Sequence, residues 1–319
     1  MNRTLHNIIT RFALTAATVG LVMGPGVIAQ AQSSASLGTT ISPPSFELTL
    51  SPGESMTKTI EIQNNSSIAQ TYKLSSNGFT AVGEEGGSAY VPSSSSDLSG
   101  WMQFDPPQSI GIPANNMAQV AVTITVPENA SPGGHYATVF ARTTAKDVTV
   151  TGVGIEQMLG INFLVRIAGN IVENASVVEF STPKARLAPG EEIMFSTRVK
   201  NTGNVHIKPT GVIEIYRGNA KIDEVPLNPT GGSILPNSIR RFDVKSIKYL
   251  PAGKYRAGLV LQYGASQVIQ VPPVEFVVVN ENLFVMVVIA SLIILAIILI
   301  IALMVNRRGP SEPMMKKQK

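Results

Sequence analysis

Two Ser-x-x-Lys spacings are the sequence features that come nearest to catalytic chemistry. They occupy Ser55–Lys58 and Ser181–Lys184, and enzymes that recognise penicillin use a serine nucleophile at this spacing from a lysine. That chemistry needs a helix, because residues three apart share a face only there. The first motif begins an alternating stretch typical of a strand, which points such residues to opposite faces, and Pro183 interrupts the second. We therefore expect no catalysis at either motif.

Histidines and carboxylates are too sparsely placed for the other common kinds of site. Beyond residue 31 the histidines are His135, which we expect to be exposed, and His206. No His-x-x-x-His, EF-hand ladder or Gly-x-Ser-x-Gly occurs. We predict a non-enzymatic protein with no metal site and no cofactor. The alternative is a hydrolase with an unrecognised site, which would need a deep pocket with two paired carboxylates.

The chain between residues 41 and 279 has the pattern of short strands. Apolar residues recur at every second position, as at Val120, Val122, Ile124 and Val126, and clusters of Gly, Pro, Asn and Ser separate the runs. Apart from the apolar stretches near the two ends of the chain, we find no amphipathic pattern with a helical period. These observations predict an all-β fold built of sandwiches.

A weak internal repeat indicates two copies of one sandwich. A Pro-Gly-Glu turn and an alternating stretch ending in asparagine span Pro52–Asn64 and Pro189–Asn201, with the same spacing of 12. The pattern Pro-x-Gly-x-Tyr then opens a long alternating stretch at Pro132–Tyr136 and at Pro251–Tyr255. Such turns are tight, and we expect the tyrosine to start the inward face. The first copy is 18 residues longer, and residues 78–100 should hold the excess as a long loop or an added hairpin.

The most apolar part of the chain is a stretch of 23 uncharged residues, Leu283–Val305. As a helix it would be about 34 Å long, enough to cross a bilayer core of roughly 30 Å. Two arginines, Arg307 and Arg308, and three lysines follow it. Because basic residues favour the cytoplasmic side, we predict a single-pass cell-membrane protein with an external N-terminal ectodomain and a cytoplasmic tail.

The N-terminus has the features of a secretory signal peptide. Arg3 and Arg11 flank the start of an apolar stretch that ends at a small-x-small site, Ala29-Gln30-Ala31. We predict cleavage after Ala31, with an uncleaved N-terminal anchor as the alternative. Under both interpretations the middle of the chain is exported.

Charge and cysteine content limit the classes of partner. Two of the 25 Lys and Arg residues lie in the signal and five in the tail, whereas one of the 21 Asp and Glu residues lies in the tail. The exported part thus carries 18 positive and 20 negative residues, which gives no argument for nucleic acid as a partner. The chain has no cysteine, so hydrophobic cores must hold the domains together.

The predicted organisation follows from these landmarks. In chain order it is a signal peptide (1–31), a linker (32–40), two immunoglobulin-like domains (41–172 and 173–280), a transmembrane helix (Leu283–Val305) and a basic tail (306–319). Because little chain separates the second domain from the span, that domain should sit close to the membrane.

Five segments together resemble a known family. They are Ile41–Leu48, the Pro52-Gly53 turn with its strand to Ser66, Gly100–Asp105, Val126–Tyr136 and the strand at 160–169. The set is similar to the N-terminal domain of the WxL-interacting proteins of Gram-positive cell surfaces, over about residues 41–172; the second half matches only at turn and strand landmarks. In that family the first domain is described as peptidoglycan-binding and the second as binding host or partner ligands. The resemblance implies a cell-wall-associated adhesion scaffold.

Three residues are candidate ligand contacts. Trp101, the only tryptophan, is expected to fill the core of the first sandwich, with stacking on a sugar of a wall glycan as the alternative. Gln103 and Tyr136 complete the candidate set. The acidic run at residues 83–87 is expected to be a solvated loop tip, with contact to a cation or a partner as the alternative.

The sequence therefore predicts a membrane-anchored scaffold or adhesin that binds cell-wall glycan, other surface proteins, or both. The alternative function is that of an assembly chaperone or accessory subunit for exported proteins. This alternative requires an exposed, apolar edge strand that captures a strand of the partner.

Overall fold

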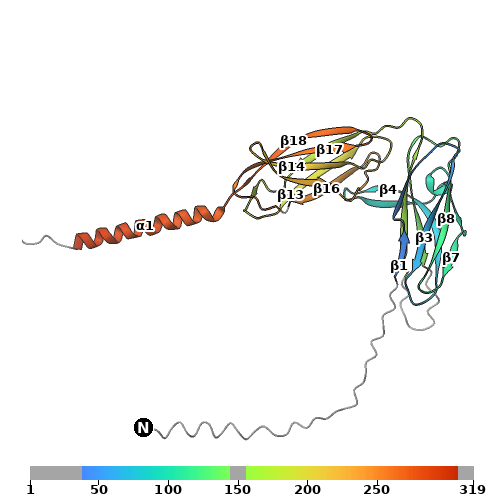
Figure 1. Ribbon diagram of the computed structural model, residues 1–319, viewed down its shortest axis with the longest axis horizontal. Coiled ribbons are helices and arrows are strands. Elements are labelled where there is room, and N and C mark those ends of the chain that lie inside the picture. The colour runs from blue at the N-terminus through green and yellow to red at the C-terminus, as the bar shows by residue number, and fades with distance from the viewer. Residues whose placement is uncertain (1–37, 144–155, 247, 308–319) are drawn as a thin grey trace, which may run out of the picture. The chain divides into compact units, whose positions relative to one another are not determined.

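The computed structural model describes residues 38–143, 156–246 and 248–307. The predicted cleavage site at Ala29 and Ala31, most of the linker, and the tail from Arg308 onward lie outside the described residues. The described part consists of two β-sandwiches followed by one long helix (Figure 1). The predicted fold class, all-β with two tandem immunoglobulin-like sandwiches and a C-terminal helix, is confirmed.

The first sandwich packs a four-stranded sheet on a larger one. The smaller sheet has the order β1 (Thr39–Ser42), β3 (Ser55–Asn64), β8 (Asn116–Thr125) and β6 (Met102–Asp105). The larger has the order β2 (Ser45–Leu50), β10 (Met158–Ile167), β9 (Gly133–Thr143), β4 (Gln70–Val82) and β5 (Gly87–Val91), with β7 (Ser109–Ile112) also paired to β4. The chain changes sheets at Pro43-Pro44, where neither residue has an amide hydrogen for a strand ladder.

Alternation along these strands places the core as the sequence predicts. Val120, Val122 and Ile124 of β8 are fully buried and face Tyr72 and Phe163 of the larger sheet in one cluster. The excess residues of this sandwich form the β4–β5 hairpin and a short 3₁₀ helix, η2 (Leu98–Trp101), so the added hairpin is confirmed.

The second sandwich repeats the plan with fewer strands. One sheet has the order β11 (Ala175–Ser181), β13 (Ile193–Asn201) and β16 (Ile239–Ser246). The other has the order β12 (Arg186–Leu187), β18 (Gln267–Val278), β17 (Gly253–Tyr263), β14 (Thr210–Arg217) and β15 (Ala220–Leu227). Phe195, Tyr255 and Phe276 meet in its core, with the rings of the last two stacked at 5.5 Å.

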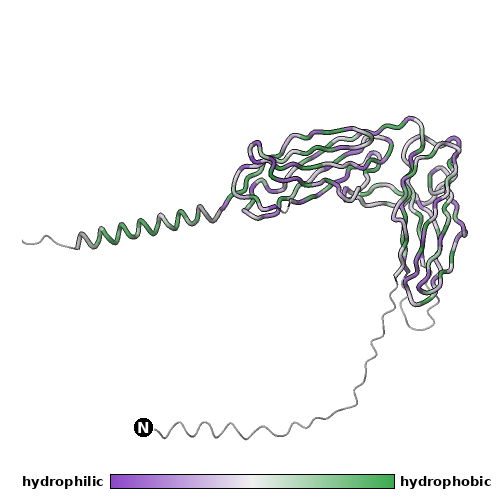
Figure 2. Tube along the Cα trace, in the orientation of Figure 1, coloured by the Kyte–Doolittle hydropathy of each residue, from purple (hydrophilic) through white to green (hydrophobic). Residues whose placement is uncertain are grey.

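The last element, α1 (Glu281–Arg307), is long and apolar enough to cross a membrane between Val285 and Met304. Figure 2 shows the contrast: apolar and polar residues alternate along the strands, whereas the helix is apolar along almost its whole length. The helix covers the predicted span Leu283–Val305 and includes Arg307 at its end.

The repeated asparagines have the same structural role in both sandwiches. Asn64 ends β3 and Asn201 ends β13, and both are fully buried. Each amide oxygen accepts a hydrogen bond from the backbone nitrogen two residues later, and each amide nitrogen donates to the carbonyl four residues later. Each nitrogen also donates to an isoleucine carbonyl of a distant loop, that of Ile112 or of Ile234. The asparagine thus ties two loops to the end of a core strand, which explains the common spacing.

We expect replacement of either asparagine by alanine to destabilise the protein strongly. Asn64→Ala or Asn201→Ala leaves buried carbonyl and amide groups without partners, a loss of roughly 2–4 kcal/mol in the free energy of unfolding. Asn65→Ala is the control, because Asn65 is exposed and makes its side-chain hydrogen bond at the surface. Urea unfolding of the detergent-solubilised chain measures the difference, and equal stability of all three variants would contradict the assignment.

Candidate functional site

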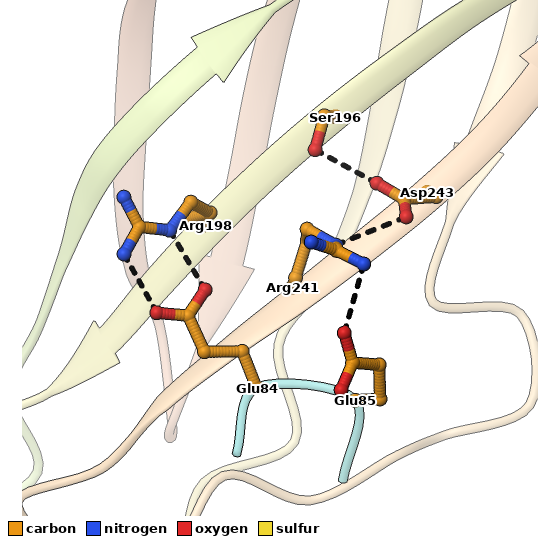
Figure 3. Close-up of polar contacts among 6 residues, drawn as sticks. All are labelled: Glu84, Glu85, Ser196, Arg198, Arg241 and Asp243. Atoms are coloured by element: carbon orange, nitrogen blue, oxygen red, sulfur yellow. Dashed lines mark hydrogen bonds and ion pairs between the residues drawn. The ribbon is translucent and has the colours of Figure 1, made fainter.

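The turn between β4 and β5 joins the two sandwiches through ion pairs. Gly83 and Gly86 have φ of +64° and +82°, a conformation that favours glycine, and they bracket Glu84 and Glu85. The Glu84 carboxylate accepts hydrogen bonds of 2.8 and 2.6 Å from the Arg198 guanidinium, and Glu85 accepts one of 2.8 Å from Arg241 (Figure 3). We call residues 83–86 the acidic turn.

The two carboxylates of the acidic turn add to those that the second sandwich itself supplies to these arginines. Arg198 of β13 and Arg241 of β16 are direct cross-strand neighbours, an arrangement of like charges that destabilises a sheet by itself. Asp243 accepts from Arg241 at 3.0 Å and Glu179 from Arg198 at 3.3 Å, so four carboxylates surround the pair. The backbone nitrogen of Arg241 also donates to the Glu84 carbonyl at 2.7 Å, which satisfies part of the edge of β16.

Behind the acidic turn lies a small apolar contact between the sandwiches. Phe79 and Leu164 of the first sandwich pack with Leu235 of the second, and Tyr136 packs against this cluster. The Tyr136 and His206 rings meet edge to face with centroids 5.6 Å apart. The junction therefore combines charge pairing at its rim with burial at its centre.

Two titratable groups are buried at the centre of the junction. Burial raises the pKa of the Tyr136 phenol; the nearby backbone of His206 opposes this shift without forming a hydrogen bond of acceptable geometry. Burial lowers the pKa of His206 to about 4, opposed by Glu47 and Glu173 and aided by Arg166 and Lys208. Both side chains are consequently neutral at neutral pH.

Arg240 is held between the two sandwiches. A Cβ at Gly86 or Gly232 would come within 2.5 or 2.7 Å of its guanidinium, so glycine backbone covers the group from both sandwiches. The guanidinium donates to the Ser233 carbonyl at 2.8 Å and lies 5.6 Å from the centroid of the Phe242 ring. Any side chain at Gly86 would therefore force Arg240 out of this position.

A cavity of about 190 Å³ remains beside Arg240. Among its described lining residues the carboxylate is Glu47, which forms an ion pair with Lys208. The cavity therefore does not supply the two paired carboxylates that the hydrolase alternative requires. Across the described residues no group of three His, Asp or Glu side chains is placed to hold a metal ion.

The three predicted ligand contacts lie in three different places. Trp101 is 7% exposed in the core, with its ring 4.9 Å from that of His135 and its Nε1 donating to the Ser95 carbonyl. Gln103 is exposed on β6 of the four-stranded sheet, whereas Tyr136 is on β9 of the larger sheet. Tyr136 faces the second sandwich, so the prediction that it starts the inward face is wrong; Tyr255, its counterpart, does point inward. The structure does not bring the three together.

The Ser-x-x-Lys motifs are engaged in other contacts. Ser55 donates to Thr125, and as residues three apart on β3 it and Lys58 point to opposite faces, as predicted. Lys184 forms an ion pair with Glu191, and Ser181 donates to Glu179. Neither lysine is placed to activate its serine.

The acidic turn is the feature that sequence reasoning missed. The prediction of a solvated tip is wrong for Glu84, whose side chain is 30% exposed, although Glu85 is still 73% exposed. The alternation of β13 placed Arg198 on the outer face, where a counter-charge could reach it. No sequence signal linked that position to a turn 114 residues away.

Comparisons with known proteins give a distant likeness to fimbrial chaperones. The class 5 fimbrial chaperone CfaA is 14% identical with a TM-score of 0.41, covering 76% of this chain and 100% of that one. The E. coli chaperone DraB is 15% identical with a TM-score of 0.36, covering 74% and 98%. The match in the chaperone–tip subunit complex CsuC–CsuE of Acinetobacter baumannii is 13% identical with a TM-score of 0.36, covering 75% of this chain and 98% of that one. No family model and no curated protein matches. At these identities the likeness concerns the fold alone.

Loss of the partly covered Glu84 carboxylate should loosen the junction more than loss of the exposed Glu85 carboxylate. Glu84→Gln removes the bidentate partner of Arg198 and leaves two arginines opposite each other, so we expect a clear fall in the midpoint of thermal unfolding. Glu85→Gln should cause a smaller fall, because exposed ion pairs contribute little. The charge exchange Glu84→Arg with Arg198→Glu should recover part of the loss, and failure to recover would argue against the pairing.

The junction should weaken as pH falls through the range in which histidine becomes charged. The folded-state pKa of His206, about 4, lies below its ordinary 6.5. The contribution of neutral His206 to the free energy of unfolding is therefore complete above pH 6.5 and decreases as pH falls toward 4. His206→Phe keeps an aromatic ring and should remove the pH dependence of the free energy of unfolding between pH 6.5 and 4.5. This range lies above the ordinary pKa of Glu84, so protonation of Glu84 does not interfere. His135→Gln, which leaves His206 in place, should retain the decrease; an unchanged profile in His206→Phe would refute the assignment.

Proposed function

We propose that this protein is a membrane-tethered, non-enzymatic accessory protein that holds an extended strand of an exported partner at the open edge of β5. One observation supports this proposal: β5 is an exposed, apolar and uncharged edge strand. This is the feature that the chaperone or accessory alternative requires.

The composition of β5 sets it apart from the other edges. Its sequence is Gly-Ser-Ala-Tyr-Val, and it ends the strand order of its sheet. Tyr90 and Val91 are 50% and 38% exposed, and Val82 across the hairpin is 53% exposed. The edge strands β2, β6, β11, β15 and β16 all carry charged residues, and the uncharged β1 and β7 expose no large apolar side chain to this degree. Charges on an edge prevent pairing with other strands, so β5 is the edge open to a partner.

The surroundings of β5 favour apolar side chains. The Tyr90 ring meets Phe140 edge to face with centroids 4.9 Å apart. Phe140 in turn covers Gly160, where a Cβ would lie 3.1 Å from its ring. A strand added beside β5 would place the side chain opposite Tyr90 next to this ring, which provides selectivity beyond backbone hydrogen bonds.

The acidic turn makes this edge rigid before a partner binds. Glu84 and Glu85 fix the tip of the hairpin to the second sandwich, and Asn77 donates to the Val91 carbonyl at its other end. An edge already held in strand geometry loses less conformational entropy on binding. In this proposal α1 tethers the edge to the membrane across which partners emerge, and the ectodomain lies outside.

Charges on β5 should abolish partner binding. Tyr90→Lys and Val91→Lys are expected to eliminate cross-linking from a photoreactive residue at position 89 to exported proteins. Val268→Lys, at an equally exposed apolar residue of β18, should leave it unchanged. Bound partner should also slow hydrogen exchange of the β5 amides. Retention of the chain by purified cell wall, with no cross-link that depends on Tyr90, would instead support the wall-binding function that the resemblance to WxL-interacting proteins implies.

A further inference from the structure

The second sandwich is attached to α1 by a very short connection. β18 ends at Val278 and α1 begins at Glu281, so two residues separate them. Gly253, the first residue of β17, pairs with Val278, and β12 pairs with the last two residues of β18. The end of the sheet formed by these strands therefore lies within a few residues of the helix.

Three cationic side chains share the outer face of this end of the sheet. Arg186 and Lys254 both pair with Val277, one from each side, and residues paired across strands share a face. Arg256 follows Lys254 by two positions and is on the same face. Glu275, the partner of Arg256 in register, is the carboxylate of this group. The group has an excess of two positive charges.

These cations differ from their neighbours in forming no ion pair among the described residues. At the same end of the sandwich Lys184 pairs with Glu191, Lys221 with Glu214 and Glu224, and Lys245 with Glu192. Within the described ranges no ion pair involves Arg186, Lys254 or Arg256. The Arg256 guanidinium lies 5.1 Å from the centroid of the Tyr216 ring, which orients it without neutralising it.

The same residues line a shallow groove of about 630 Å³. Arg186, Lys254 and Arg256 contribute its charge, and Ala185 and Val277 contribute apolar surface. The groove has the size of a small-molecule site and is lined by hydrogen-bond donors suited to a phosphate group.

We propose that this basic face, formed by Arg186, Lys254 and Arg256, binds the anionic phospholipid headgroups of the bilayer that α1 enters. Three residues lie between Val277 and Glu281, so the two are at most about 14 Å apart. Charges this close to an anionic surface lie near the Debye length of roughly 10 Å, so the attraction is not fully screened. The proposal rests on α1 crossing a membrane, and it is independent of strand binding by β5.

Binding to lipid would fix which side of the second sandwich faces the bilayer. Each Lys or Arg near an anionic surface increases the population of the membrane-bound orientation about fivefold, so three such residues increase it roughly a hundredfold. Without them the two-residue connection leaves the sandwich free to rotate about the end of the helix.

Energy transfer in nanodiscs tests this proposal with the full chain. The chain has no cysteine, so Asn219→Cys places a single donor dye in the turn between β14 and β15, beside Gly218 of the groove. With acceptor dye on the headgroups, we expect transfer to rise when phosphatidylglycerol replaces part of the phosphatidylcholine. The triple variant Arg186→Gln, Lys254→Gln, Arg256→Gln should remove this rise.

A matched triple variant of remote lysines, Lys58→Gln, Lys73→Gln and Lys200→Gln, should keep it. Equal transfer in both lipids, or the same rise in the groove variant, would overturn the proposal. Loss of the rise in millimolar inorganic phosphate at constant ionic strength would assign the groove to a free phosphate and not to lipid, which also overturns it. If the chain fails to incorporate into nanodiscs of either lipid, the span itself is wrong.

Discussion

The pairing of Glu84 with Arg198 is the interaction on which the arrangement of the two sandwiches depends. Two arginines opposite each other on β13 and β16 would repel in an isolated second sandwich. The first sandwich supplies the compensating carboxylates from its own hairpin, and Arg198 holds the pKa of Glu84 below its usual range. Glu84 and Glu85 thus complete the set of counter-charges that Glu179 and Asp243 of the second sandwich begin.

This constraint links features that are far apart in the sequence. The acidic turn positions β5, whose edge is open, and it covers Arg240 together with Gly86 and Gly232. The contact between the sandwiches also includes the ion pair of Glu47 with Lys208 and a backbone hydrogen bond from Gly134 to the Asn204 carbonyl.

Local sequence patterns accounted for most of the fold but little of the site. Alternation identified the inward face of β8, and the common spacing from Pro52 to Asn64 and from Pro189 to Asn201 marked equivalent strands in the two sandwiches. Both signals are local, because they are read from residues close together in the sequence. The acidic turn depends on two arginines contributed by strands more than a hundred residues away. Tyr136 was assigned to the wrong face because the second sandwich, which covers the outer surface of β9, leaves no trace in the alternation of that strand.

The direct connection between β18 and α1 also has a mechanical consequence. In the proposed arrangement, with α1 in a bilayer, tension on the chain would enter the second sandwich through β11 and β18, its first and last strands. β18 is hydrogen-bonded on both sides, to β12 and to β17. A pull along its axis would load many backbone hydrogen bonds at once instead of opening them one after another, so the second sandwich would resist unfolding under tension.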